Sequence, residues 1–348
     1  MMKAAVLGAT GSVGQIFVQM LCGHPWFGVS VVAASERSVG QKYSEAARWR
    51  LPTPIPENVS ELEVVDIEPK AVANMEDVDV VFSALPAEAA GRAEENFARA
   101  GYVVVSNASS HRMDPDVPLV NPEVNCDHAC LIDEQRKKRK WNGAIVTNPN
   151  CSATVLTLSL KPIYDEFGIR KVIVSTMQAI SGAGYPGVAS LDIVDNVIPF
   201  ITNEEEKMQA ETLKVFGSTS KLADFKISAS CHRVPTLDGH MEAVFVEPER
   251  EADSDSVMAA MEKFVGEPQK LRLPTAPAKP VVVRNEEDRP QTRLDRMEGG
   301  GMSVVVGRVR RDRVLMGVKY VVLGHNTIRG AAGCGVLNAE YLKAKKYL

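Results

Sequence analysis

The first 21 residues constrain the fold of this chain more than any other stretch. Residues 3–7 are an apolar run that predicts a buried strand, and apolar residues at helical spacing over 13–21 predict a helix. Gly8, Gly11 and Gly14 lie at the junction in a G-x-x-G-x-x-G pattern, a variant of the commoner G-x-G-x-x-G. Glycines let the backbone approach a diphosphate, and the helix start offers free N–H groups. We therefore predict a dinucleotide-binding unit.

The kind of dinucleotide is predicted from the end of the second strand, residues 29–34. A carboxylate at this point, roughly 20 residues past the glycines, usually binds a free 2′-hydroxyl. Here the chain carries Ser35, Glu36, Arg37 and Ser38. Two hydroxyls and a guanidinium suit a 2′-phosphate, so the segment favours NADP, while Glu36 leaves NAD open.

Strands and helices continue to alternate through the first half of the chain. Residues 78–83 and 102–106 read as strands around a helix over 87–99. This rhythm predicts a parallel sheet with its ligands at the carboxyl ends of the strands. Ser83 and Leu85 close one strand and are candidates to line the cofactor groove.

The second half of the chain has a different pattern. An Asp-Gly pair in the short connection between 227–234 and 240–246 predicts a hairpin that sets Arg233 opposite His240. Further strands are predicted near 281–284, 302–309 and 314–323. The fold class is therefore α/β, with an N-terminal Rossmann-type parallel sheet domain and an α+β domain whose sheet is mostly antiparallel.

Cys151 stands where a strand over 144–147 gives way to a helix. Asn148 or Asn150 can cap that helix, and Pro149 ends the strand. A thiol at this point meets unpaired N–H groups and the positive end of a helix dipole, and both favour the nucleophilic thiolate. The alternative is a buried structural cysteine, the commoner fate of a free thiol.

A nicotinamide site, an activated cysteine and a histidine together point to one chemistry. A thiolate attacks an aldehyde, hydride leaves to the nicotinamide, and a thioester remains for phosphate or another nucleophile to cleave. In reverse, an acyl phosphate is reduced to the aldehyde. The histidine moves a proton at the carbonyl oxygen, and backbone N–H groups hold the oxyanion.

A helix that begins near Asn203 carries one polar stripe. The stripe consists of Glu204, Lys207, Glu211 and Lys214. An exposed ladder of ion pairs is the ordinary fate of such a stripe, and we predict that here.

Composition excludes several classes of protein. A net charge of −4 gives no reason to expect nucleic acid or an anionic membrane as partner. The six cysteines form no disulfide framework, and the cysteines and histidine of 126–130 lack a second ligand pair at zinc-site spacing, so no metal is predicted. No apolar run is long enough to span a membrane, and no signal peptide is recognisable. We expect a cytoplasmic protein.

Seven separated motifs occur in the order found in the aspartate-semialdehyde dehydrogenase family, and over its whole length the chain most resembles the archaeal/fungal-type branch. They are GATGSVGQ at 8–15, SNASSHRM at 106–113, NPNCSAT at 148–154, QAISGAGYPG at 178–187, EEEKMQAET at 204–212, RVPTLDGH at 233–240 and NTIRGAAG at 326–333.

The resemblance implies a role for each matching residue. Cys151 is the implied nucleophile, His240 the acid and base, and Gln178 the residue that orients the acyl intermediate. Arg233 is implied to bind the substrate carboxylate and Glu204 its amino group, while Lys207, Arg112 and Asn150 form the phosphate site. The implied cofactor residues are Gly8, Thr10, Gly11, Ser12, Val13, Ser35, Arg37, Ser38, Gly182 and Asn326.

The resemblance also implies the organisation and the reaction. Residues 1–150, completed by a C-terminal helix over 326–348, are the expected NADP-binding domain, and 151–325 the catalytic and dimerisation domain of a homodimer or homotetramer. The implied reaction is NADPH-dependent reduction of L-4-aspartyl phosphate in lysine, threonine and methionine biosynthesis. Archaeal malonyl-CoA reductases are similar and share the cysteine and histidine, so a CoA thioester stays open as substrate. A catalytically inactive dinucleotide sensor is the alternative of another class.

Overall fold

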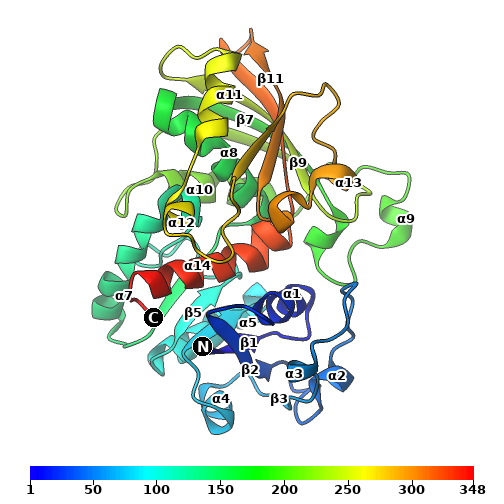
Figure 1. The fold of residues 1–348 in the computed structure, drawn as a ribbon, viewed down its shortest axis with the longest axis vertical. Helices are drawn as coiled ribbons and strands as arrows, with labels where there is room; N and C mark the ends of the chain where they lie inside the picture. The colour runs from blue at the N-terminus through cyan, green and yellow to red at the C-terminus, as the bar shows by residue number, and fades with distance from the viewer.

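The structure is a computed structural model that describes residues Met1–Leu348. Two six-stranded sheets, one in each half of the chain, organise the molecule (Figure 1). The first is parallel and the second mixed and mostly antiparallel, so the predicted fold class is confirmed.

The first sheet has the strand order β3-β2-β1-β4-β5-β6, and every neighbouring pair is parallel. Its strands are β1 (Met2–Leu7), β2 (Phe27–Ala33), β3 (Val64–Val65), β4 (Val80–Ser83), β5 (Val103–Ser106) and β6 (Ala144–Thr147). Because the strands are parallel, all their carboxyl ends meet at one edge, where open α/β sheets bind ligands.

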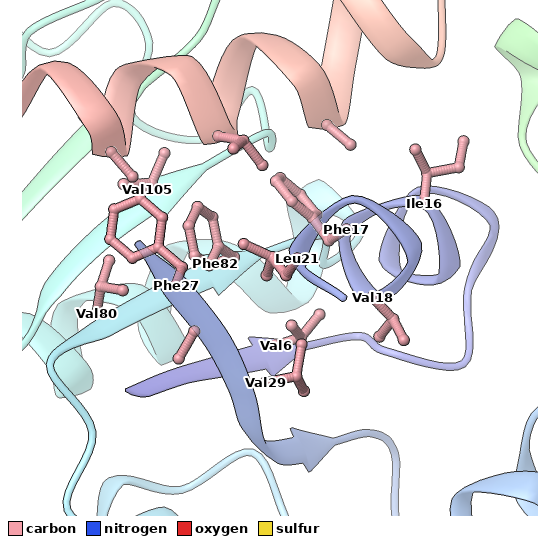
Figure 2. Close-up of a cluster of buried hydrophobic side chains, with 14 of the residues drawn as sticks. Val6, Ile16, Phe17, Val18, Leu21, Phe27, Val29, Val80, Phe82 and Val105 are labelled. Carbon is pink, nitrogen blue, oxygen red and sulfur yellow. The ribbon is translucent and has the colours of Figure 1, made fainter. Parts of the chain in front are cut away.

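Helices cover both faces of this sheet. They are α1 (Ser12–Leu21), α2 (Tyr43–Ala46), α3 (Glu57–Ser60), α4 (Pro69–Met75), α5 (Ala87–Arg99), α6 (Pro122–Asn125), α7 (Leu131–Arg139) and, from the far end of the chain, α14 (Gly333–Ala344). Figure 2 shows Phe17 and Leu21 of α1 packed with Phe27 and Phe82 of the sheet, beneath the red helix α14. The C-terminal helix is therefore part of the first hydrophobic core.

The second sheet has the order β10-β11-β12-β9-β7-β8. Its strands are β7 (Ile169–Gln178), β8 (Lys226–Arg233), β9 (His240–Pro248), β10 (Val281–Arg284), β11 (Val304–Asp312) and β12 (Gly317–Gly324). The pairs β7–β8 and β10–β11 are parallel, and the other three are antiparallel.

The predicted hairpin between β8 and β9 is wrong, because β7 lies between these two strands. The connection over 234–239 bonds instead to the chain leaving β7: Val234 donates to the carbonyl of Gln178, and Ile180 donates to that of Thr236. With its backbone groups satisfied there, the connection crosses the end of β7. Gln178 is consequently aligned with Arg233 in the β7–β8 register.

One face of the second sheet is covered by helices and the other is open. The helices of this half are α8 (Cys151–Phe167), α9 (Ser190–Ile193), α10 (Glu204–Phe216), α11 (Ser254–Lys263), α12 (Glu267–Lys270) and α13 (Thr292–Asp295). Leu156 of α8 and Val257 of α11 pack in the second core with the buried side chains of the sheet. On the opposite face, Ile173 of β7 is 46% exposed. None of the helices combines the length and apolar character needed to cross a bilayer.

Candidate active site

Cys151 is the first residue of α8, as predicted. The side-chain oxygen of Asn150 accepts hydrogen bonds from the backbone N–H groups of Ser152 at 2.9 Å and Ala153 at 3.2 Å. Asn150 is thus the N-cap, and its side chain uses donors that would otherwise be unpaired. The cap fixes the first turn of the helix and with it the direction of the thiol.

His240, the first residue of β9, faces this thiol. Its Nε2 lies 3.2 Å from Cys151 Sγ, and the backbone N–H of Ala179 donates to its Nδ1 at 3.1 Å. Because Nδ1 accepts that bond, the neutral imidazole carries its proton on Nε2. The ring therefore presents an N–H group to the sulfur and to any oxygen bound beside it.

Burial favours the neutral form of both groups. It raises the pKa of the Cys151 thiol to about 12, with Glu204 adding to the rise and Arg112 and Arg233 opposing it. Burial likewise lowers the pKa of His240 to about 3, helped by the positive charge of Arg233. The helix start alone led us to expect a thiolate, but desolvation outweighs it in the protein without ligands.

Three predicted residues meet beside the cysteine through one carboxylate. Glu204, the first residue of α10, accepts hydrogen bonds from Asn150 Nδ2 at 3.0 Å and from Gln178 Nε2 at 3.0 Å. All three side chains are buried. The carboxylate accepts hydrogen bonds from two neutral amides, so a cationic group of a ligand can be its third partner.

Arg112 and Lys207 supply positive charge on the neighbouring side. Arg112 is buried, donates to the carbonyl of Asn107 at 2.7 Å and pairs with Glu211 at 3.0 Å. Its Nε–H has no partner, a buried donor that an anion can satisfy. Lys207 is half-buried and its ammonium is unpaired.

Arg233 lies across the site, at the end of β8. Its Nη1 donates to the carbonyl of Ala179 at 2.8 Å, so the same short segment orients both Arg233 and His240. A Cβ on Gly182 would lie 2.8 Å from Arg233 Nη1 and 3.0 Å from the His240 ring. Glycine is needed at this position because the loop passes so close to both side chains.

The predicted cofactor turn has the features of a diphosphate cradle. Gly8 has a φ of +73°, and a Cβ there would lie 2.8 Å from the carbonyl oxygen of Ala84. Gly11 is the N-cap of α1, and no side chain caps this helix, so its first N–H groups face outward unpaired. Thr10, Ser12 and Val13 belong to the same turn.

The other predicted cofactor residues lie at separate points of the same edge. Ser35 and Arg37 are exposed and Ser38 half-buried just after β2, where a 2′-phosphate can meet the Arg37 guanidinium. Asn326 accepts from the N–H of Gly239 and donates to Ser181 Oγ, both at 2.8 Å, and so ties two loops beside Gly182.

Ser83 and Leu85 contribute less than their position in the sequence suggests. The Ser83 hydroxyl is fully buried and donates to Glu94 at 2.6 Å, so it does not face a groove. Leu85 is also buried, and its side chain packs under Gly8. Leu85 therefore packs against the glycine turn, and Ser83 is part of the buried strand beside it.

Two residues beside the site, Glu211 and Lys214, were not predicted as functional from the sequence. Glu211 and Lys214 were assigned to an exposed polar stripe, but together with Glu204 they are buried, which corrects that prediction. The stripe packs against the loops that carry Arg112 and Asn150. The usable signal was the position of Glu211 and Lys214 on the same helical face as Glu204, seven and ten residues later.

Two family models match successive parts of this chain. A family model described as the NAD binding domain of semialdehyde dehydrogenase matches residues 3–132, and one described as the dimerisation domain of the same family matches residues 160–329.

Curated relatives and solved structures are similar to this chain over nearly its whole length. Aspartate-semialdehyde dehydrogenase of Methanothermobacter thermautotrophicus is 56% identical, with 98% of this chain and 99% of the relative covered. Malonyl CoA reductase (NADP) of Metallosphaera sedula is 45% identical, with 100% and 98% covered. The crystal structure of aspartate-semialdehyde dehydrogenase with NADP from Candida albicans superposes with a TM-score of 0.92 at 40% identity and covers both chains fully. The chain belongs to the aspartate-semialdehyde dehydrogenase family.

Proposed function

We propose that this protein is an NADP-dependent aspartate-semialdehyde dehydrogenase. It reduces L-4-aspartyl phosphate to L-aspartate 4-semialdehyde and phosphate, reversibly, in cytoplasmic lysine, threonine and methionine biosynthesis. The observation that carries the proposal is Cys151 at the start of α8, 3.2 Å from His240, between a carboxylate and three cationic side chains. The relatives at 54–56% identity that bear this name support it.

The substrate fits the charges of the site. Arg233 binds the α-carboxylate, for which a guanidinium is the preferred partner, and Glu204 binds the α-ammonium. At the other end, Arg112 and Lys207 receive the phosphate, with the unpartnered Arg112 Nε–H as one donor. Asn150 completes this subsite. The acyl carbon then lies between the two ends of the substrate site, beside Cys151.

The chain's own residues carry the acyl transfer. The Cys151 sulfur attacks the acyl carbon, the carbon–oxygen bond to phosphate breaks, and a thioester forms as phosphate leaves toward Arg112 and takes the proton of the thiol. Gln178 orients the acyl group from the end of β7. His240 holds the developing oxyanion through its Nε2–H. After reduction, the carbon–sulfur bond breaks, the aldehyde leaves, and the Cys151 sulfur takes up a proton from solvent to restore the thiol.

NADP is the cofactor of this reaction, and in its reduced form it supplies the hydride that converts the thioester to the aldehyde. The residues that would hold it are those described above: the turn from Gly8 to Val13, the Ser35–Ser38 segment, Gly182 and Asn326. The solved relative that contains NADP supports this assignment.

We also propose how the chain divides its work. Residues 1–150 with 326–348 form the NADP-binding domain, and 151–325 the catalytic and dimerisation domain. The open face of the second sheet, where Met241, Ala243 and Phe245 of β9 alternate with buried residues, joins two copies as a homodimer, which can pair again as a tetramer. The matched dimerisation family supports the dimer.

The test follows NADPH formation by purified protein from L-aspartate semialdehyde, with and without phosphate. Fast reduction of NADP that requires phosphate is the expected result. If the protein instead oxidises NADPH only with malonyl-CoA, the protein is a CoA-thioester reductase, as the relative from Metallosphaera sedula is by name.

Replacement of the nucleophile gives the first mutational prediction. Cys151→Ser should lower turnover at least about a thousandfold, because a serine hydroxyl is a far weaker nucleophile than the sulfur of cysteine. NADP binding, measured by calorimetry, should persist. Cys130→Ser, at an exposed cysteine, is the matched control and should keep full activity. Normal turnover by Cys151→Ser, or NADP reduction without a thioester trapped on Cys151, contradicts the mechanism.

A further inference from the structure

Glu211 is a deeply buried acidic residue beside the site that the reaction does not use. Only 1% of its surface is exposed, although it lies in the middle of α10. A buried carboxylate is costly unless each oxygen accepts strong hydrogen bonds. The hydrogen-bond partners of its two oxygens therefore indicate the role of the residue.

The two oxygens have different partners. Oε1 accepts from Arg112 Nη1 at 3.0 Å, and Oε2 accepts from the backbone N–H of Asn150 at 2.5 Å. Arg112 belongs to the phosphate subsite, and Asn150 is the N-cap immediately before the nucleophile. One carboxylate thus connects the group that receives the leaving phosphate to the helix start that aims the thiol.

The same helix holds the Arg112 loop a second time, one turn further on. The Lys214 ammonium donates to the carbonyl oxygens of Arg112 at 2.6 Å, Asp114 at 2.7 Å and Val117 at 2.9 Å. All three donors are used, so the backbone around Arg112 is fixed by Lys214 and its guanidinium by Glu211.

We propose that Glu211 is a positioning residue that sets the distance between the phosphate subsite and the Cys151 sulfur. This inference rests on the proposed function, because it takes Arg112 as the phosphate ligand and Cys151 as the nucleophile. Glu211 itself touches neither substrate nor cofactor. Its carboxylate also balances the charge of Arg112, which keeps the guanidinium in place when no phosphate is bound.

No other side chain fits both contacts. Glutamine has one acceptor oxygen, so its amide would set an N–H group against either Arg112 or the Asn150 N–H. Aspartate is shorter by one methylene and reaches one partner at most. Either substitution therefore separates the two groups that Glu211 holds together.

The experiment compares Glu211→Gln and Glu211→Asp with wild type and with Glu206→Gln. Glu206 is exposed on the same helix and makes no hydrogen bond, so its substitution is the matched control. Four quantities are measured: kcat and the KM values for phosphate and aspartate semialdehyde in NADP reduction, the melting temperature, and the rate at which iodoacetamide alkylates Cys151 in the free protein.

In both Glu211 variants we expect kcat to fall and the KM for phosphate to rise, each by about tenfold or more, the size of a lost charged hydrogen bond. The KM for aspartate semialdehyde should change less than twofold, because Arg233 and Glu204 are untouched. Cys151 should be alkylated several times faster, since the loops beside it are no longer tied.

Other outcomes overturn the inference. A lower melting temperature with an unchanged KM for phosphate and an unchanged alkylation rate would make Glu211 a structural residue only. The wild-type protein separates failure of this inference from failure of the proposed function. If wild type shows no phosphate-dependent NADP reduction, the proposed function is wrong. The alkylation rates of the variants still report whether Glu211 positions Cys151.

Discussion

At the scale of single residues, the site depends on how His240 is held. The backbone N–H of Ala179 occupies Nδ1, so a second proton on the ring would set two hydrogen atoms against one another. Burial and the charge of Arg233 act in the same direction and lower the pKa to about 3. His240 therefore stays a neutral donor across the physiological range, suited to hold an oxyanion rather than to form an ion pair with the thiol.

This arrangement has a measurable cost in stability at acid pH. Between pH about 6.5 and about 3 the unfolded chain binds a proton on His240 that the folded protein does not, so the free energy of unfolding falls as the pH is lowered. His240→Gln removes this contribution. Between pH 7 and pH 4.5, urea unfolding should show about 2–3 kcal/mol less loss of stability in the variant than in wild type.

His232 supplies the control, because it is a half-buried histidine of the same sheet, on strand β8. His232→Gln should keep the pH dependence of the wild type. Equal slopes for wild type and His240→Gln would mean that His240 takes up its proton in the folded protein, and the tautomer argument would then fail.

At the scale of elements, α10 shows both what the sequence could predict and what it could not. Helical spacing predicted the helix and the common face of its charged residues. Whether that face meets water or protein depends on which loops dock against it, and those loops come from the other half of the chain. The same limit explains the wrong hairpin: local turn residues predicted two strands and their connection correctly, but the insertion of β7 between them is a long-range pairing.

The reactive residues were easier to predict from the sequence than the long-range contacts that hold them. Cys151 and its cap Asn150 follow from a strand, a proline and a helix start, all within a few residues. The roles of Gln178 and Arg233 came from the resemblance to a family, since nothing local distinguishes a catalytic glutamine from any other. Glu211 was missed because its two partners lie 99 and 61 residues away.

The helical segment before α14 packs closely against Cys151, and this contact can be tested by substitution. Gly330 lies in a π-helical turn over Ile328–Ala332, and a Cβ there would lie 2.7 Å from the Cβ of Cys151. Gly330→Ala should therefore displace the thiol from His240 and lower kcat about a hundredfold, because a shift near 1 Å has an effect of that order.

Gly91, a half-buried residue of helix α5, is the matched control. The nearest atom to a Cβ at this position is 3.7 Å away, so Gly91→Ala should keep full activity and stabilise the protein by up to about 1 kcal/mol. If Gly330→Ala turns over at the wild-type rate, the contact between this turn and α8 is not rigid.

At the scale of the whole molecule, the two halves are joined by elements that also form the site. The chain returns from the second sheet through Asn326 and the buried Arg329, which pairs with Glu123 at 2.6 Å, and ends with α14 in the first core. Loops from both halves thus surround the cysteine.

A second connection crosses between the halves beside the glycine turn, where the blue segment beyond α2 meets the green chain leading to α9 (Figure 1). The Arg50 guanidinium stacks on the Tyr185 ring, 3.3 Å from its centroid. Gln15 fixes this segment to the turn, since its Nε2 donates to the carbonyls of Thr10 and Arg48 and its Oε1 accepts from the Arg50 N–H, each at 3.0 Å.

Tyr185 lies three residues past Gly182, so the Arg50–Tyr185 contact links the two sides of the proposed cofactor groove. Tyr185→Ala should raise the Kd for NADP about two- to fivefold, the range of an exposed cation–π contact, mainly through faster dissociation. Tyr185→Phe keeps the ring and should retain most of the affinity. Lys42→Ala, at an exposed lysine immediately before α2, should bind NADP as wild type does. Calorimetry and stopped-flow fluorescence measure both quantities without turnover. An unchanged Kd in Tyr185→Ala would show that the halves stay closed over the cofactor without this contact, held by Arg329 and α14 alone.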